Sequence, residues 1–449
     1  MTAVRAPSLL AGSLDEFRRD RLGLFRRLSR EGGAYAQLRI RRTQVLFLND
    51  PELIGQVLGV RRDHFSKDYL RPLFNPLVRG SIEIADSDSW LHERKLAMPA
   101  FHARRLESYG TDMVDLTERM LAGWRPGEAR DISADMSGLT LEIVAKTLYG
   151  IDASRYRGDA RDAIAIVMED FADRAGSLLA LPVIIPNLRT LRFVRALYRL
   201  NKELNRMIRE RRATGAEGPD LFEMLIRAKD EHGRPMSDRQ VRDVSIAIFF
   251  AGHETTATLL SWTWHLLASH PDVEARLVEE FESVLGDNRP TYADMSRLPF
   301  AEMVLAEALR LYPPAYGFGR LCLRECQLEG LRVPAGAVTL MSPWAMHRDP
   351  RFYDDPDAFL PDRWADGLAK RLPRYAYFPF GGGPRMCLGS NFATLEATLV
   401  LATVLRKFRL RSLPGWRVEP QPSITLRPKG GLRMSVESGE AVRKSPALA

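Results

Sequence analysis

Apolar residues along this chain of 449 residues recur mainly with the spacing of helices. From about Leu91 to Leu311 they return every three or four positions, which predicts a long helical region. Shorter strand-like stretches occupy about residues 34–48, 321–340 and 416–436. Residues 438–449 are expected to form a disordered tail. The pattern therefore predicts a mainly α protein with a smaller β-rich lobe.

One apolar stretch, from Val244 to Leu267, is long enough to run through the centre of the molecule. Ser237 and Gln240 predict a capping box at its start, and Pro271 predicts its end. A helix of about 33 residues would be about 50 Å long, at about 1.5 Å per residue. We therefore expect a buried helix that crosses the whole protein.

Glu254 and Thr255 lie side by side in this apolar helix. Burying an acid and an alcohol is costly unless both are hydrogen-bonded. Taken alone, the threonine favours a structural interpretation, in which its hydroxyl bonds back to the carbonyl of Ala251 and bends the helix near Gly252. A chemical role for the pair needs support from other residues.

Near the other end of the chain, Cys387 lies in the glycine-rich run from Phe380 to Gly389, with Arg385 two residues before it. Residues 390–407 contain no Gly or Pro and predict a helix. A cysteine at the start of a helix is stabilised as a thiolate by the helix dipole and the unpaired amides. One cysteine cannot complete a zinc site, which takes about four ligands, whereas a haem iron needs one axial protein ligand. The run therefore favours a haem-thiolate site.

These features resemble the cytochrome P450 superfamily, in its bacterial form. Phe380, Gly383, Arg385, Cys387 and Gly389 match the pattern Phe-x-x-Gly-x-Arg-x-Cys-x-Gly. The resemblance covers about residues 30–435. Three further elements match in the family's order along the chain: Trp90-x-x-x-Arg94, Ala251-Gly252-His253-Glu254-Thr255-Thr256, and Glu307-x-x-Arg310 with the later turn Pro361-Asp362-Arg363-Trp364.

The resemblance implies one catalytic domain over residues 1–437, with the long helix above a haem b and the thiolate loop beneath it. It implies that Cys387 is the axial ligand and that Glu254 and Thr255 deliver protons during oxygen activation. It also implies a buried network that supports the loop, formed by Glu307, Arg310 and Arg363. The residues implied to contact the haem are Trp90, Arg94, Ala251, Arg320, Phe380, Gly383, Arg385, Cys387 and Gly389.

By position in that fold, several apolar segments are expected to line a substrate chamber. The expected lining residues are Leu73, Phe74, Ile82, Ala247, Ile248, Ala251, Ala315, Tyr316 and Phe318. Because almost all are apolar, we expect an uncharged substrate such as a fatty acid, a terpenoid or a steroid-like molecule. The apolar connection 178–186 either borders this chamber or touches a membrane surface.

The net charge of +8 does not indicate nucleic acid, because the basic residues are scattered and no nucleic-acid motif is present. No flavin or iron–sulfur sequence follows residue 437, so the resemblance implies a separate electron donor. We expect an acidic ferredoxin or flavodoxin with its NAD(P)H reductase, attracted by basic residues near the thiolate. These are Arg94, Lys95, Arg104, Arg105, Lys370, Arg371 and Arg374.

Three cysteines in so long a chain indicate a reducing compartment without disulfides. Cys322 and Cys326 are expected to be small buried hydrophobic side chains. No stretch approaches about 18 apolar residues, and the N-terminus lacks an apolar leader. We therefore expect a cytoplasmic monomer without a transmembrane anchor.

The reaction implied is monooxygenation, in which one oxygen atom of O2 enters an apolar substrate. Two alternatives are a peroxygenase driven by hydrogen peroxide and a haem protein that senses without turnover. The presence of Glu254 and Thr255 argues against the peroxygenase, since peroxide already carries both oxygens and protons. The substrate, the position of oxidation and the physiological reductant are not encoded in these patterns.

Overall fold

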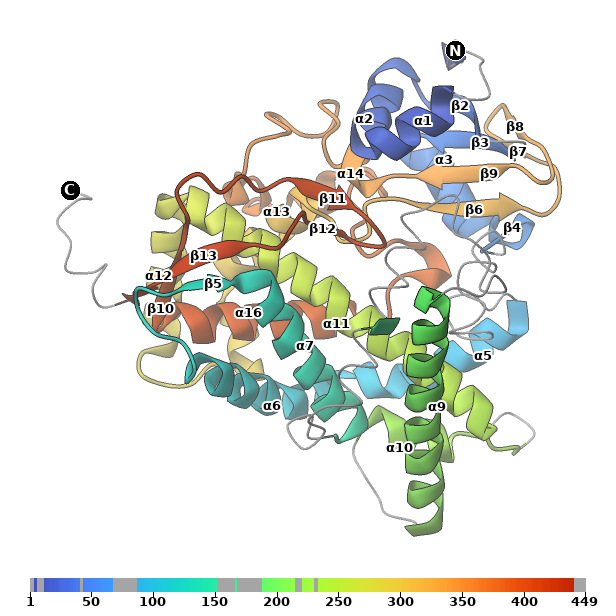
Figure 1. Cartoon of the computed structure of the whole chain (residues 1–449). Helices are drawn as coiled ribbons and strands as arrows, with labels where there is room; N and C mark the ends of the chain where they lie inside the picture. The colour runs from blue at the N-terminus through green and yellow to red at the C-terminus, as the bar shows by residue number, and fades with distance from the viewer. Residues whose placement is uncertain are drawn as a thin grey trace.

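A computed structural model of the chain describes residues 4–5, 12–40, 43–67, 87–151, 166–167, 188–214, 220–229 and 233–439. Helices form the larger part of the described molecule, and most strands gather in a lobe beside the N-terminal helices (Figure 1). The predicted mainly α fold with a smaller β-rich lobe is confirmed. In the described residues, no helix is both long and apolar enough to span a bilayer.

The helices account for most of the described chain. In order, they are α1 (Gly12–Arg19), α2 (Arg21–Glu31), α3 (Pro51–Gly55), α5 (Ser87–Ala97), α6 (Ala103–Leu121), α7 (Ile132–Tyr149), α9 (Leu188–Thr214), α10 (Leu221–Arg227), α11 (Asp238–Ser269), α12 (Pro271–Leu285), α13 (Pro299–Leu311), α14 (Pro343–Met346), α15 (Leu368–Arg371) and α16 (Ser390–Leu405).

The largest described sheet has the strand order β1-β2-β3-β9-β6-β4. Its strands are β1 (Val4–Arg5), β2 (Tyr35–Ile40), β3 (Thr43–Leu48), β9 (Val338–Met341), β6 (Phe318–Cys322) and β4 (Phe65–Ser66). The predicted hairpin of residues 34–48 is present, and β3 also pairs in parallel with β9. Two chain segments nearly 300 residues apart therefore form one lobe.

Smaller sheets complete the fold. A three-stranded sheet joins β10 (Phe408–Ser412), β13 (Arg433–Ser438) and β5 (Ala129–Asp131), and two hairpins pair β7 (Cys326–Leu328) with β8 (Leu331–Val333) and β11 (Pro420–Pro422) with β12 (Leu426–Pro428). The predicted strand regions 321–340 and 416–436 are thus confirmed, although the second contains parts of two sheets.

The central helix predicted from the sequence is α11. The Ser237 hydroxyl accepts a hydrogen bond from the Gln240 amide, and the Gln240 side chain accepts one from the Ser237 amide, so the capping box is present. Pro271 begins α12 directly after the end of α11. α11 runs diagonally through the molecule and packs against α7, α13 and α16 (Figure 1). It is the frame on which the candidate site is built.

Candidate active site

Three consecutive glycines shape the loop that contains Cys387. Gly381 and Gly383 have φ of 70° and 65°, which residues with a Cβ rarely adopt. A Cβ on Gly382 would lie 2.2 Å from the Tyr375 ring, and one on Gly383 would lie 2.0 Å from the carbonyl oxygen of Leu58. The loop therefore needs glycine here for conformation and for close packing.

The loop presents Cys387 to its surroundings. The Cys387 amide donates to the Phe380 carbonyl over 2.9 Å, and α16 begins at Ser390, three residues later. The Cys387 side chain is exposed, whereas Cys322 and Cys326 are buried. Burial raises the pKa of Cys322 to about 12 and also raises the pKa of Cys326. Cys387 is thus the cysteine available to an external ligand or cofactor, and the other two are buried as predicted.

Helix α5 is tied to this loop through the residues predicted from the Trp-x-x-x-Arg element. Arg94 donates to the Met386 carbonyl over 2.9 Å. The Arg385 guanidinium lies 4.4 Å from the centroid of the Trp90 ring. The fold therefore brings Trp90, Arg94 and Arg385 together beside Cys387.

Arg320 approaches the same loop from strand β6. Its guanidinium is buried and lies 5.6 Å from the centroid of the Phe318 ring. Phe318 packs edge-on against Phe378, with ring centroids 6.0 Å apart. The Phe378 carbonyl in turn accepts a hydrogen bond from the Gly381 amide. Phe318 thus lies next to the glycine run, and Arg320 lies beside Phe318.

The middle of α11 carries the predicted acid and alcohol. The Thr255 hydroxyl donates to the Ala251 carbonyl over 2.6 Å, so the hydrogen bond expected from the structural interpretation is present. Glu254 accepts a hydrogen bond from the Thr425 hydroxyl over 3.0 Å, and burial raises the pKa of Glu254. Although adjacent in sequence, the two groups have different partners. Ala251 is exposed within this otherwise largely buried helix, which leaves space on its side of α11.

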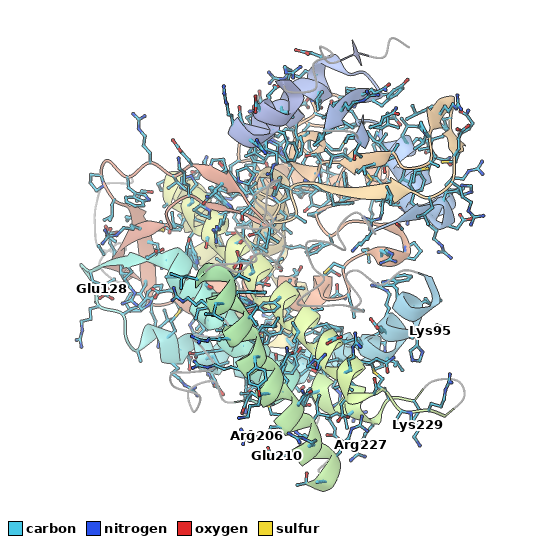
Figure 2. All side chains as sticks on the ribbon, turned by 45° about the vertical axis from the view of Figure 1, so that its right-hand side comes forward. Lys95, Glu128, Arg206, Glu210, Arg227 and Lys229 are labelled. Carbon is cyan, nitrogen blue, oxygen red and sulfur yellow. The ribbon has the colours of Figure 1, made fainter. Side chains whose placement is uncertain are left out.

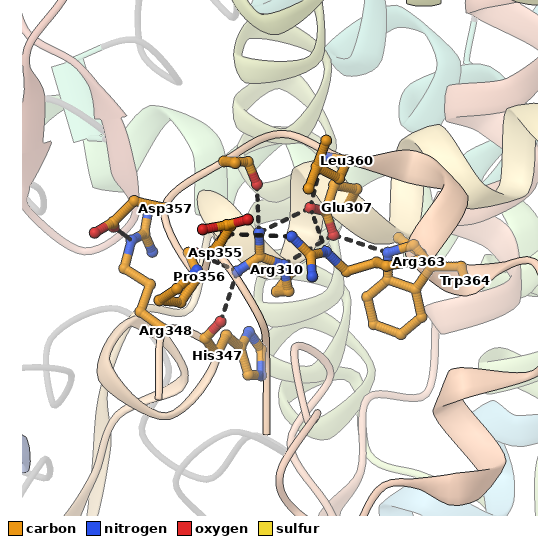
Figure 3. Close-up of polar contacts among 12 residues, drawn as sticks. Glu307, Arg310, His347, Arg348, Asp355, Pro356, Asp357, Leu360, Arg363 and Trp364 are labelled. Carbon is orange, nitrogen blue, oxygen red and sulfur yellow. Dashed lines mark hydrogen bonds and ion pairs between the residues drawn. The ribbon is translucent and has the colours of Figure 1, made fainter. Parts of the chain in front are cut away.

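Glu307 and Arg310 form a fully buried ion pair on α13 (Figure 3). The Arg310 Nη2 to Glu307 Oε1 distance is 2.7 Å. Glu307 also accepts bonds from Arg363 Nε over 2.9 Å and from Trp364 Nε1 over 2.8 Å. Burial of such a pair is tolerated only when the remaining donors and acceptors are satisfied. The predicted network of Glu307, Arg310 and Arg363 is therefore present, and Trp364 belongs to it.

His347 connects this network to the cysteine loop, a role that the sequence does not indicate. Its carbonyl accepts from Arg310 over 2.8 Å, and its Nε2 accepts from the Phe378 amide over 2.9 Å. Burial holds the pKa of His347 well below its usual range, so the ring is neutral and can accept. The network thus reaches to within two residues of Phe380.

Glu396 on α16 is a second residue that sequence reasoning missed. Its carboxyl is fully buried, and burial raises its pKa well above the usual range, partly offset by the Thr256 hydroxyl. A single acid within the apolar run of α16 is the signal that could have marked it. Glu396 is therefore held protonated beside α11.

Besides Ala251 and Phe318, the expected chamber residues differ in where they lie. Leu73, Phe74 and Ile82, like the connection 178–186, lie outside the described residues. Ala247 and Ile248 are buried on α11, and Ala315 is exposed.

Tyr316 lies elsewhere, in the core of the N-terminal lobe. Its hydroxyl donates to the Ser423 carbonyl over 2.8 Å, and its ring stacks on Phe25 at 6.4 Å between centroids. Its side chain is thus committed to packing that lobe, and we do not retain it as a chamber residue.

Comparison with known proteins gives a consistent picture. The Cytochrome P450 family model matches residues 5–434. Cyclooctatin synthase of Streptomyces melanosporofaciens is 35% identical over 408 residues, 90% of this chain and 89% of the relative. Cyclooctat-9-en-7-ol 5-monooxygenase of the same organism is 35% identical over 386 residues, 85% and 84% of the two chains.

The fold agrees as well. The solved structure of retinoic acid-bound cyanobacterial CYP120A1 superposes with a TM-score of 0.87 at 26% identity, covering 96% of this chain and 97% of the other. Enzymes of this family are monooxygenases that carry a haem with a thiolate ligand and draw electrons from a redox partner. The chain belongs to the cytochrome P450 family.

Proposed function

We propose that this enzyme inserts one oxygen atom of O2 into an apolar, terpenoid-like substrate, with Cys387 as the axial ligand of haem b. The observation that carries the proposal is the placement of Cys387. It is the one exposed cysteine of the three, in a glycine loop before α16, with Trp90, Arg94 and Arg385 gathered beside it. When bound, a haem-thiolate supplies activated oxygen for transfer to a hydrocarbon.

The residues around the loop fit this cofactor. A haem carries two propionates, and guanidinium and indole N–H groups are suitable donors to carboxylates. Arg94, Arg320 and Arg385 with Trp90 would hold the propionates. The network of Glu307, Arg310 and Arg363 would keep the loop in place through His347. Residues 1–437 would act as a single catalytic domain.

Glu254 and Thr255 would move protons during the reaction. Because burial raises the pKa of Glu254, its carboxyl keeps a proton to higher pH than an exposed glutamate does. Thr255 now donates to the Ala251 carbonyl, so a rotation of its hydroxyl would redirect that proton toward the space beside Ala251. The pair favours O2 over hydrogen peroxide as the oxidant, since peroxide brings its own protons.

The substrate class rests on the relatives, some of which oxidise terpenoids, and on the apolar residues near the site. Ala247, Ile248, Ala251, Ala315 and Phe318 carry no charge, which suits a hydrocarbon skeleton. The electron donor would be an acidic ferredoxin or flavodoxin with its NAD(P)H reductase, in the cytoplasm.

Purified protein loaded with haem tests the proposal. The reduced carbonyl complex should give the thiolate-type Soret band, and Cys387→Ser should abolish it, while Cys322→Ser should leave it unchanged. Persistence of the band in Cys387→Ser would refute the ligand assignment.

The substrate class has its own test. A terpenoid library should then produce the Soret shift that accompanies substrate binding, followed by NAD(P)H-dependent oxidation with a ferredoxin system. Turnover with peroxide alone would favour the peroxygenase, and an absence of turnover with either would favour a sensor.

A further inference from the structure

The Glu254 carboxyl is held by a residue from a distant part of the chain. Its Oε1 accepts a hydrogen bond over 3.0 Å from the hydroxyl of Thr425, which lies 171 residues later and directly before β12. Thr425 is 4% exposed, and Glu254 is half-buried. A carboxyl with little access to water keeps the position in which its hydrogen bond is made, because a buried polar group without a partner costs free energy. Thr425 therefore determines where this carboxyl lies.

The backbone that carries Thr425 is fixed in place. The amide of the next residue, Leu426, donates to the Pro314 carbonyl over 3.0 Å. The Leu426 carbonyl accepts from Nε1 of Trp262, which lies about two turns beyond Glu254 on α11. The hairpin of β11 and β12 thus lies against α11 (Figure 1). The Thr425 hydroxyl therefore keeps its place relative to α11 and cannot follow a carboxyl that moves away.

Glu254 and Thr255 face different surroundings although they are neighbours. Consecutive residues of an α-helix point about 100° apart around the helix axis. The Glu254 carboxyl accordingly contacts Thr425, whereas the Thr255 hydroxyl donates to the Ala251 carbonyl. The carboxyl must therefore turn away from Thr425 before it can hand a proton to Thr255.

Strand β12 leads from this carboxyl to the surface. Thr425 and Leu426 are buried, Arg427 is half-buried and Lys429 is exposed. Burial, the largest effect, raises the pKa of Glu254, while the Thr425 hydrogen bond and the positive charge of Arg427 oppose it. Because these effects act in opposite directions, the carboxyl is suited both to take up a proton and to release it.

We propose that Thr425 is a positioning residue for proton delivery, which holds the Glu254 carboxyl against β12 until the carboxyl turns toward Thr255. The proton that leaves the carboxyl is then replaced from water at the surface end of β12. This inference rests on the proposed function, because it assumes that Glu254 delivers protons. The alternative is a purely structural role, in which the Thr425 hydroxyl only satisfies a half-buried acid. That role would leave the coupling of electrons to product unchanged in every variant that folds.

Infrared titration of the haem-loaded full chain tests the positioning directly. The C=O stretch of protonated Glu254 is assigned by its absence in Glu254→Gln. Thr425→Val keeps the shape of the side chain but removes the hydroxyl, so the ionisation of Glu254 should shift to higher pH, because a donor to the carboxylate is lost. Thr425→Ser keeps a hydroxyl and should titrate as wild type does. Thr263→Val, which removes a hydroxyl bonded to the Leu259 carbonyl elsewhere on α11, is the matched control.

Coupling tests the consequence for proton delivery. Product formed per NAD(P)H is measured with the ferredoxin system and a terpenoid selected by its Soret shift with wild type. Thr425→Val should lower this ratio at least about threefold, because the proton donor is no longer held in place. Thr425→Ser and Thr263→Val should stay within about 1.5-fold of wild type. The pH profile of the ratio in Thr425→Val should move in the same direction as the infrared titration. The Soret spectrum and the thermal midpoint report the folding of each variant.

Two results would overturn this inference alone. The first is an infrared titration of Thr425→Val that matches wild type. The second is unchanged coupling in Thr425→Val when Glu254→Gln lowers it. Unchanged coupling in Glu254→Gln would instead refute the role of Glu254 in the proposed function, and the positioning role of Thr425 would fall with it.

Discussion

At the scale of single residues, Thr255 has both a structural role, its hydrogen bond within α11, and a proposed chemical role in proton delivery. Its hydroxyl donates a hydrogen bond to the Ala251 carbonyl. The Thr255 residue is half-buried and lies next to Glu254 in α11. Thr256 makes the same kind of bond to Gly252 but is buried. The two threonines therefore share a local structure and differ in what they face.

Thr255→Ala should separate these interpretations. We expect haem and substrate binding to stay within about twofold of wild type, while the fraction of NAD(P)H electrons that reaches product falls at least about tenfold, because a positioned proton donor is lost. Product formation per NAD(P)H and hydrogen peroxide release measure this coupling. Thr256→Ala is the matched control, and equal coupling in all three proteins would remove Thr255 from proton delivery.

Glu93 on α5 makes stability depend on pH. Burial, with a smaller contribution from Asp243, raises the pKa of Glu93 from 4.5 to about 8, and its Oε2 has no hydrogen-bond partner among the described residues. Between these values the unfolded chain is ionised at this residue while the folded protein keeps the proton. The stabilising contribution is therefore complete below pH 4.5 and is lost as the pH rises to about 8.

Glu93→Gln should remove this dependence. The difference between 4.5 and about 8 corresponds to at most about 5 kcal/mol. The thermal midpoint of the variant should exceed that of wild type by several degrees at about pH 8 and by little at about pH 5. Glu107→Gln, at an exposed position on α6, should change the midpoint at neither pH. A difference that does not vary with pH would contradict the titration of Glu93.

At the scale of elements, local signals decided which predictions succeeded. The ends of α11 were predicted within about a residue, because a capping box and a proline act on neighbouring residues. No signal in the apolar pattern marks the division between α1 and α2, where the Asp20 carboxylate accepts a hydrogen bond from the Gly23 amide and starts a new helix. Strands β5 and β10 were missed, since they are short and each is held by β13, which is remote in sequence from β5.

The cysteine loop gives a prediction that depends on element packing. Gly383→Ala combines a positive φ with a contact of 2.0 Å between the new Cβ and the Leu58 carbonyl, a backbone atom that cannot rotate away. We expect the haem content, measured as the ratio of Soret to 280 nm absorbance, to fall at least about tenfold. The cause is displacement of the loop, at a cost beyond the roughly 1–2 kcal/mol of backbone conformation.

Gly367→Ala separates the two causes. Gly367 has φ of 68°, but a Cβ there has no neighbour within 4 Å. This variant should therefore bear only the conformational cost and keep its haem. Equal loss of haem in both variants would show that backbone conformation, not the contact with Leu58, sets the requirement for glycine.

At the scale of the whole molecule, the sequence located the elements of the site but not their connections. The motif residues around Cys387 and Glu307 were predicted because each motif is local. The hydrogen bond from the Phe378 amide to His347 joins residues that are far apart in sequence, and so does the packing of Tyr316 on Phe25. Such contacts follow from tertiary packing, which no local pattern encodes.

Electron delivery gives the prediction that concerns the whole surface. Lys95 is exposed and follows Arg94, whose side chain donates to the Met386 carbonyl (Figure 2). Arg374 is exposed and precedes Tyr375, whose ring packs on Gly382. Each cation thus adjoins, in sequence, a residue that contacts the cysteine loop, where the proposed acidic carrier would dock. Lys95→Glu/Arg374→Glu should slow reduction by an acidic ferredoxin about tenfold or more at low salt, because charge attraction sets the association rate.

The salt dependence and a second surface make this result specific. Stopped-flow reduction in the presence of carbon monoxide should show the deficit shrinking as salt is raised to about 0.5 M, where the attraction is screened. Arg195→Glu/Arg199→Glu on α9 carries the same change in charge but should be reduced at the wild-type rate, since both residues lie outside the proposed docking surface. A deficit of equal size in both variants would mean that net charge, rather than the surface beside Cys387, steers the carrier.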